Sequence, residues 1–256
     1  MNGDSQHLRL AGVTTVGMTP RRGPNTAFFF DPHRLALPCW ALALEGREPA
    51  LLVTLDRHLD QVPPQDVAAI PRREDGLRAL DEHARWHLST RNDDHVIAAM
   101  EAGLIGDVVA IARTRLSNVM PGTEWLDRAG RSHHVLMVPT VQRLSDGFLG
   151  APTTECERLQ QWLSRGGPVI LDVDLDCFTT QSDADPTTVI PWPAHVVEEF
   201  LMPEGADAFW DAILARCVAL TFAREAFHCG GLRAEAELFR TVVEVLFGRV
   251  LGVPPP

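Results

Sequence analysis

Hydrophobic and polar positions alternate along the chain in two kinds of segment. Short continuous apolar runs are typical of strands buried on both faces of a sheet, and they predict strands at 26–30, 50–55, 108–111, 134–139 and 217–222. A further run starts at Pro168 and leads into Leu171-Asp172-Val173-Asp174-Leu175-Asp176. Segments with apolar residues at helical spacing lie between the strands and predict helices at 34–44, 75–90, 93–102, 155–165, 207–215 and 233–246.

This alternation of strands and helices predicts an α/β fold, with a mostly parallel central sheet and helices on both faces. No shift in composition divides the chain, so we expect a single domain over residues 26–250. Residues 1–25 have the composition of a polar N-terminal arm, and residues 251–256 form a proline-rich tail. We expect loops at 116–131 and 179–193, the second long enough to form part of a pocket rim.

Acidic and histidine side chains follow three of the predicted strands, at the point where each strand ends. They are Asp31 and His33, then Asp56, His58 and Asp60, and finally Asp172, Asp174 and Asp176. In open α/β sheets ligands bind outside the carboxyl ends of the strands, and alternate positions of an extended segment share one side. We therefore expect these side chains to meet at one rim of the sheet.

Carboxylates gathered at a buried strand end would repel one another unless a cation lies between them. Asp is almost never fully buried without a partner, and carboxylate and imidazole ligands suit manganese, iron, zinc or nickel. The set offers more ligands than one ion needs, so it predicts two ions that share a water and lower its pKa. The alternative for the acidic triplet alone is an exposed strand end with solvated acids.

The charge of the chain limits the kinds of partner that it can bind. The formal net charge is −11, which argues against a nucleic-acid-binding face and suits a cationic substrate or metal ions. All 23 basic residues are Arg, and there is neither Lys nor Tyr. A Schiff-base lysine, a P-loop lysine and a tyrosine general acid are therefore excluded.

Cysteine usage and the N-terminus indicate the compartment. The five cysteines are scattered, without a Cys-x-x-Cys pair, which favours reduced thiols over a disulfide framework. The polar N-terminus shows no signal peptide, and no apolar run reaches the roughly 18 residues that span a bilayer. We expect a cytoplasmic enzyme that is not bound to a membrane.

The order of the strand-end motifs resembles that of the arginase or ureohydrolase superfamily. Members carry a lone metal-binding His, then Asp-Ala-His-x-Asp, then Asp-x-Asp, and this chain shows His33, Asp56-Arg57-His58-Leu59-Asp60 and Asp172-Val173-Asp174. The surrounding residues look more like a divergent branch that contains the peptide arginases. The resemblance implies an arginase/deacetylase-like three-layer sandwich. Two departures stand out, since the Gly-Gly-Asp-His context of the first ligand is missing and Arg57 replaces a small residue.

The resemblance implies a binuclear manganese hydrolase that converts arginine side chains within a ribosomally made peptide to ornithine and releases urea. It implies one Mn2+ held by His33, Asp56, Asp60 and Asp172, and a second held by His58, Asp56, Asp172 and Asp174. The contacts that free-arginine enzymes make to the α-amino and α-carboxyl groups are not recognisable. An arginine inside a peptide is therefore the expected substrate.

Further residues are assigned roles beside simpler alternatives. Glu225 follows strand 217–222 and is expected to bind the guanidinium, the alternative being a salt bridge or a helix cap. His228 is a candidate proton shuttle, and a structural loop histidine otherwise. The residues Asn92, Asp93, Asp94 and His95 either line the substrate pocket or cap the helix at 93–102, and Asn92 and Asp94 are the expected substrate contacts. Second-shell positions are expected for two acids, Asp31 and Asp176.

Two other functions remain open at this stage. A deacetylase-like amidohydrolase of similar fold would use a single zinc, and a non-catalytic scaffold of the same fold would keep the metal without the reaction. The amount and kind of metal per chain separate the first alternative from a two-manganese enzyme. A homo-oligomer is compatible with the sequence, which does not define the assembly.

Overall fold

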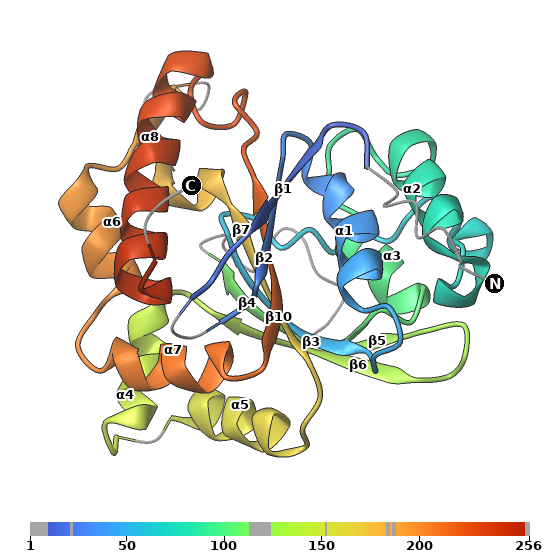
Figure 1. Ribbon diagram of the computed structural model, residues 1–256, viewed down its shortest axis with the longest axis horizontal. Helices are drawn as coiled ribbons and strands as arrows, with labels where there is room; N and C mark the ends of the chain where they lie inside the picture. Colours follow the sequence, from blue (N-terminus) through green and yellow to red (C-terminus); the bar gives the residue numbers. More distant parts are fainter. Residues whose placement is uncertain are drawn as a thin grey trace.

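The structure is a computed structural model, and it describes residues 10–20, 23–112, 124–151, 153–182, 185 and 188–253. Its centre is an eight-stranded sheet with the order β1-β2-β10-β7-β3-β4-β6-β5 (Figure 1). The strands of this sheet are β1 (Val13–Gly17), β2 (Thr26–Phe30), β3 (Ala50–Asp56), β4 (Ile105–Ala112), β5 (Glu124–Leu126), β6 (Ser132–Val138), β7 (Val169–Asp174) and β10 (Cys217–Ala223).

The six inner strands, from β2 to β6 in sheet order, are all parallel to their neighbours. Only the two edge strands, β1 and β5, pair in the antiparallel sense. A separate hairpin is formed by β8 (Thr179–Gln181) and β9 (Val189–Pro191). The prediction of a mostly parallel central sheet is confirmed.

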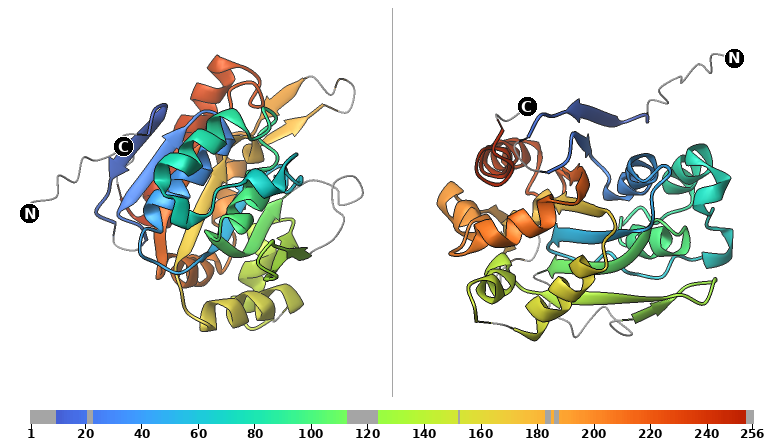
Figure 2. Two further views of the ribbon diagram at one scale, coloured as in Figure 1. Left: turned by 90° about the vertical axis from the view of Figure 1, so that its right-hand side faces the viewer. Right: turned by 60° about the horizontal axis from the view of Figure 1, so that its bottom comes forward.

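Helices cover both faces of the sheet and complete three layers (Figures 1 and 2). One face carries α1 (Ala36–Ala43), α2 (Leu77–Trp86) and α3 (His95–Glu101). The other face carries α4 (Val141–Phe148), α5 (Thr154–Ser164), α6 (Ala194–Leu201), α7 (Ala206–Leu214) and α8 (Leu232–Val245), the last of which continues into a π-helical turn, Leu246–Leu251. Short 3-10 turns lie at His33–Leu35, Val67–Ala69, Arg73–Asp75 and Leu175–Phe178.

Two apolar cores lie on opposite faces of the sheet, and successive strand residues alternate between them. Leu52 and Ile170 belong to the core beneath α1 to α3, whereas Val53 and Leu171 belong to the core beneath α4 to α8. Because side chains of a strand point to alternate faces, a strand with two buried faces must be apolar throughout. This explains why the central strands are recognisable as continuous apolar runs.

Several elements differ from the predictions. Strand β1 lies inside the predicted polar arm, of which residues 1–9 are outside the described part. Strand β5 lies inside the predicted loop 116–131, whose residues 116–123 are not described either. The β8–β9 hairpin occupies much of the predicted loop 179–193, and α4 and α6 are additions to the predicted helices. The short edge and hairpin strands are partly exposed and lack the apolar runs of the inner strands.

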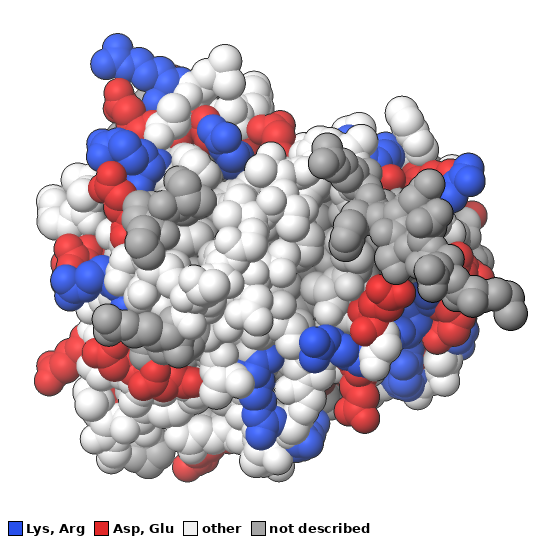
Figure 3. All heavy atoms as spheres, in the orientation of Figure 1, with Lys and Arg blue, Asp and Glu red and all other residues white. Residues whose placement is uncertain are grey.

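The face over β1 and β2 is uncharged at its centre, and acidic and arginine side chains mix around its margin (Figure 3). Among the described residues, no helix combines the length and the apolar character needed to cross a membrane.

Candidate metal centre

Four neighbouring strands deliver polar side chains to one end of the sheet. In sheet order these strands are β2, β10, β7 and β3, and their carboxyl ends lie at the same edge because all four are parallel. His33 follows β2, Glu225 follows β10, Asp174 ends β7, and Asp56 ends β3. Residues far apart in the sequence therefore meet at the rim where ligands bind in such folds.

The imidazole of His33 is the centre of the cluster. Its Nδ1 lies 3.0 Å from Asp60 Oδ2, 3.1 Å from Asp174 Oδ2 and 3.6 Å from Asp56 Oδ2. All four side chains are buried, and their ligand atoms form one compact group. Spacings near 3 Å suit oxygens and nitrogens around a divalent cation with bonds of about 2.1 Å.

The other ring nitrogen of His33 is held by Asp172. His33 Nε2 lies 2.9 Å from Asp172 Oδ2, which also accepts a hydrogen bond from the hydroxyl of Thr54 at 2.9 Å. The hydroxyl of Thr221 donates to Asp172 Oδ1 at 2.6 Å and accepts from Trp40 Nε1 at 3.0 Å. A carboxylate on one imidazole nitrogen orients the ring and leaves the other nitrogen for a metal. Nδ1 of His33 therefore faces the carboxylates and is the nitrogen that a metal could take.

This arrangement differs from the ligand set that the family resemblance implied. Asp172 is 1% exposed, lies outside every group of converging ligand atoms among the described residues, and has both oxygens engaged. At Nδ1 of His33, the nitrogen that faces the ligand group, the contacting acid is Asp174 instead. Asp172 lies deeper in the sheet than the ligand groups. It is opposite Thr54 and Thr221 in the neighbouring strands, two residues before β7 ends.

A second group of ligand atoms adjoins the first and shares Asp56. His58 Nδ1 lies 3.1 Å from Asp176 Oδ2 and 3.7 Å from Asp56 Oδ1. Asp176 is completely buried, whereas the His58 side chain is 45% exposed. Asp176, expected in the second shell, therefore stands among the possible ligands.

The chemistry of both groups fits divalent cations. Nδ1 of His33 and Oδ2 of Asp176 are buried polar atoms without a hydrogen bond of good geometry among the described residues, although Oδ2 of Asp176 also lies 3.2 Å from the charged Arg57 Nη2. Buried polar atoms are normally satisfied, so each such exception calls for an explanation. Hard carboxylate oxygens with imidazole nitrogens are the ligands that Mn2+ and similar ions take. A cation in each group would satisfy both atoms.

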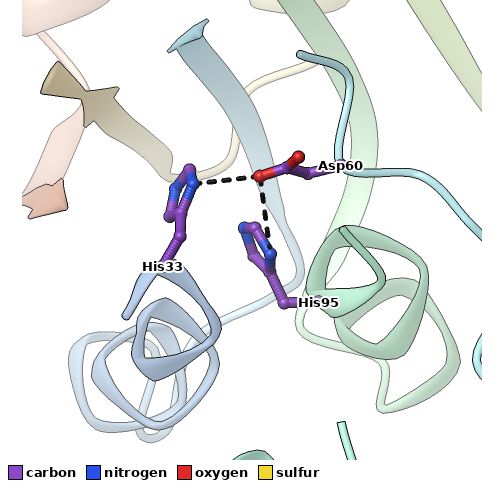
Figure 4. Close-up of side chains that lie close together, drawn as sticks. All are labelled: His33, Asp60 and His95. Carbon is purple, nitrogen blue, oxygen red and sulfur yellow. Dashed lines mark ion pairs between the residues drawn. The ribbon is translucent and has the colours of Figure 1, made fainter. Parts of the chain in front are cut away.

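His95 adds a third histidine next to the cluster (Figure 4). It opens α3, is fully buried, and its Nδ1 lies 3.8 Å from the same Asp60 oxygen that faces His33. The rings of His95 and His33 are 4.2 Å apart. Burial and the charge of His33 lower the pKa of His95 to about 4, so it is neutral near pH 7. From the sequence, His95 is predicted to line the pocket or cap a helix, and its place beside the metal ligands is not predicted.

The acids of the cluster divide into two kinds. Burial would raise the pKa values of Asp60, Asp172 and Asp176, but the neighbouring histidines hold them below their usual values, whereas the other groups reflect crowded negative charge. Burial alone would lower the pKa of His33, but the carboxylates around it, Asp172 foremost, hold that pKa well above its usual value. Burial and neighbouring carboxylates raise the pKa of Asp56 well above its usual value. Burial and the charge of Asp176 raise the pKa of Asp174 to about 6. These acids repel one another, and a bound divalent cation would favour their ionised forms.

A cavity of about 250 Å3 opens beside the cluster. Its lining residues include His58, Asp60, Asn92, Asp174, Glu225 and His228. Oε1 of Glu225 accepts hydrogen bonds from the Asn92 amide and from the backbone N–H of His33, the latter at 2.8 Å. Burial, and then the charge of Asp174, raises the pKa of Glu225 to about 8. A guanidinium bound in this cavity would place a positive charge beside Glu225 and favour its ionised form.

The backbone around the cavity is strained. Asp60, Asn92 and Glu225 are the only residues other than glycine with positive φ in the described part of the chain, at 50°, 61° and 36°. All three line the cavity. Each such conformation costs about 1–3 kcal/mol and is found preferentially where function requires it. Within the described chain, positive φ at residues other than glycine therefore occurs only around the candidate site.

The remaining predicted site residues lie at different distances from the cluster. The ring of His228 lines the cavity, with Nε2 3.6 Å from Glu225 Oε2. Asp94 turns away, because its Oδ2 accepts from the backbone N–H of Ser89 at 2.9 Å. Asp31 is exposed, lines a separate hollow next to β1, and belongs to none of the ligand groups among the described residues.

The fold and the site together define an α/β protein with a buried cluster of histidines and acids that could hold metal ions. No protein-family model matches the sequence, and no curated protein matches it. Among solved structures, proclavaminate amidino hydrolase from Streptomyces clavuligerus matches with a TM-score of 0.45 and 16% identity, over 86% of this chain and 61% of that one. Arginase from Bacillus caldovelox matches with a TM-score of 0.42 and 14% identity, over 86% of this chain and 68% of that one.

The chain thus spans 61% of the length of the amidino hydrolase. At these scores and identities, the function has to be inferred from the residues of the site.

Proposed function

We propose that the chain is a hydrolase with two Mn2+ ions that acts on the guanidinium of arginine side chains within a peptide, releasing urea and leaving ornithine. The observation that carries the proposal is the buried cluster in which three carboxylates converge on Nδ1 of His33, beside a cavity that contains Glu225. Cation ligands and a carboxylate for a guanidinium lie together at the rim of the sheet.

The ligands of the two cations follow from the two groups. We assign His33, Asp56, Asp60 and Asp174 to the first, and Asp56, His58 and Asp176 to the second. Compared with the sets implied by the family resemblance, Asp174 replaces Asp172 and Asp176 replaces Asp174. A second group of ligands supports a binuclear enzyme over the single-zinc deacetylase alternative.

Glu225 is the proposed guanidinium-binding residue. Its Oε1 is fixed by Asn92 and by the backbone of His33, and Asn92 is fixed in turn by Arg34 Nη1, 2.8 Å from its Oδ1. A carboxylate held in this way presents a defined geometry to the planar fork of a guanidinium. Substrate binding brings a positive charge to an acid whose pKa is raised by burial, and so favours its ionised form.

Hydrolysis adds water to the guanidinium carbon and breaks the bond from that carbon to the side-chain nitrogen, which leaves as an amine. Divalent cations, when bound, make water a nucleophile at neutral pH. His228 lines the cavity with its side chain 37% exposed, and we assign to it the delivery of the proton that the leaving nitrogen requires. Burial lowers the pKa of His228 below its usual value, so it is mostly neutral at pH 7 and can relay a proton from solvent.

A peptide substrate is supported by the surface around the cavity. Phe227, next to His228, is 88% exposed, and Ile190 of β9 is 52% exposed. The two segments meet where β9 lies against Gly230, because a β-carbon on that glycine would lie only 3.2 Å from the carbonyl oxygen of Val189. Large apolar side chains at the rim of a site mark a surface for a partner rather than for a small polar molecule.

The proposal is tested by measuring urea released from arginine-containing peptides of varied flanking sequence, with free arginine as the comparison. The metal-free protein is assayed with and without added Mn2+, and the peptides are weighed by mass spectrometry. We expect Mn2+-dependent urea, with a mass loss of CN2H2 for each arginine converted.

An acetyl-lysine peptide with Zn2+ serves as the control for the deacetylase alternative. Deacetylation without urea would replace the proposed reaction by that alternative. A protein that takes up cations but converts none of the peptides would instead be consistent with a scaffold.

A further inference from the structure

Arg57 places a positive charge directly against one of the two ligand groups. It stands inside Asp56-Arg57-His58-Leu59-Asp60, and its side chain is only 11% exposed. Its Nη2 lies 3.2 Å from Oδ2 of Asp176, and its Nη1 donates to the hydroxyl of Thr179 at 3.1 Å. The guanidinium is therefore held between the second ligand group and the first residue of the β8–β9 hairpin.

Arg57 and His58 converge on the same oxygen. His58 Nδ1 is 3.1 Å from Oδ2 of Asp176, and Arg57 Nη2 is 3.2 Å from it. A cation bound by His58 and Asp176 would share that oxygen with the guanidinium. Asp176 is completely buried, so little water screens the charges that meet there.

The first ligand group has no such competitor among the described residues. Oδ2 of Asp60 faces His33 and His95, and Oδ2 of Asp174 faces His33. No arginine forms a salt bridge with either acid within the described chain. The first group thus offers three carboxylates to a cation, whereas the second offers Asp56, which it shares, and Asp176, which is already paired.

We infer that Arg57 makes the second cation position weaker than the first, so that the two positions fill in sequence and the second responds to the concentration of free metal. This rests on the proposed two-cation function. An arginine keeps its charge under all ordinary conditions, so the second cation has to overcome a fixed repulsion and displace or share an existing ion pair. Arg57 acts here through the Asp176 oxygen that it occupies, and contact with the substrate is not required.

The test is a titration of metal-free protein with Mn2+, followed by calorimetry and by electron paramagnetic resonance, which detects coupling between two neighbouring Mn2+ ions. Wild type is compared with Arg57→Met, which keeps the length of the side chain without its charge, and with Arg57→Lys, which keeps the charge. Arg57→Gln is a second neutral variant, and circular dichroism verifies the fold of each. Arg91→Met removes a charge from the exposed wall of the same cavity and serves as the matched control.

In wild type we expect two binding steps, the second at a higher Mn2+ concentration than the first. Arg57→Met and Arg57→Gln should lower the Kd of the second step by about tenfold or more, because a buried like charge has been removed. The first step should change less, since its ligands do not pair with Arg57. Arg57→Lys should behave like wild type, and Arg91→Met should shift the second Kd by no more than about threefold, because exposed charges are screened.

Two results would overturn the role of Arg57. One is an unchanged second Kd in both neutral variants, and the other is a weaker second step, which would show that the guanidinium assists the cation by holding Asp176. Either result leaves the proposed hydrolase intact, because two Mn2+ would still bind. If no variant binds Mn2+ at all, the proposed two-manganese function itself fails, along with the inference built on it.

Discussion

Two regions of the molecule bury acidic side chains, and they do so in opposite ways. Near the margin of the sheet at β5 and β6, Glu101 accepts hydrogen bonds from Trp125 Nε1 and from Arg128 Nε, both at 2.9 Å. Asp127 accepts from Arg131 Nε at 2.7 Å, and His133 Nε2 lies 3.3 Å away. Both acids are less than 5% exposed, and each has an arginine of its own.

At the carboxyl ends of the central strands the balance is different. Five buried aspartates, namely Asp56, Asp60, Asp172, Asp174 and Asp176, lie around His33 and His58, and Arg57 is the one arginine that pairs with any of them among the described residues. Burying an acid is therefore not in itself the sign of a site. A deficit of positive charge around several buried acids is the feature that points to cations from solution.

The largest effect should come from removing a ligand of the first group. Asp174→Asn keeps the shape of the side chain but removes one of the three carboxylates around His33. We expect Mn2+ binding at the first position to be lost and urea release to fall about 1,000-fold or more, which corresponds to about 4 kcal/mol. Metal content by elemental analysis and the urea assay measure the two effects.

Asp107→Asn is the matched control, because Asp107 pairs with Arg165 at the protein surface and lies outside the ligand groups. Its metal content and activity should stay at the wild-type level. Full activity in Asp174→Asn would remove that residue from the catalytic metal site.

A smaller effect, on stability rather than on activity, is expected where the acids have partners. Burial would raise the pKa of Asp127, but hydrogen bonds from Arg131 and His133 lower it to about 2. At pH 7, Asp127→Asn should lower the free energy of unfolding by about 2 kcal/mol, since a charge held by buried hydrogen bonds is removed. Urea denaturation at several pH values measures the difference.

The sign of the pH dependence follows from the lowered pKa of Asp127. Its contribution is complete above the unfolded value of about 4 and is lost as the pH falls through about 2. The gap between wild type and Asp127→Asn should close over that range.

In metal-free protein Asp174→Asn should have the opposite effect and stabilise by about 1 kcal/mol, because it relieves repulsion. Equal losses in both variants would refute the contrast between the two regions.

Much of the site could be predicted because a parallel sheet brings the carboxyl ends of its strands together at one edge. Continuous apolar runs identify β2, β3, β7 and β10 as buried strands, and parallel strands end at one edge. His33, Asp56 and Asp60 follow those strands, so their meeting follows from the topology. The short strands β1 and β5 were missed because edge strands are not buried on both faces.

The register within the acidic triplet could not be predicted from alternation. Asp172, Asp174 and Asp176 occur at every second position, so alternation alone does not tell which of them reach the rim. Two residues of a strand span about 6.6 Å, which is enough to separate a ligand from a residue that holds a ligand in place. The hydrogen bonds of Asp172 with Thr54 and Thr221 keep this acid inside the sheet, away from the rim. They depend on strands that are distant in the sequence, so alternation within one strand does not reveal them.

The smallest predicted effect extends the same contrast to exposed apolar side chains. Phe227 is 88% exposed beside the cavity, and Trp86 on α2 is 78% exposed outside the cavity lining. If Phe227 packs against the residue next to the target arginine, Phe227→Ala should lower kcat/KM for a peptide about tenfold, the effect of losing about 1.4 kcal/mol of apolar contact. Hydrolysis of a small guanidine too short to reach the rim should be unaffected, and so should the midpoint of unfolding, because the exposed ring contributes little to the core. Trp86→Ala should change neither rate. Equal losses for the peptide and the small guanidine in Phe227→Ala would mean that the ring acts on the catalytic groups through His228, whose ring centroid is 5.4 Å away, rather than on the peptide.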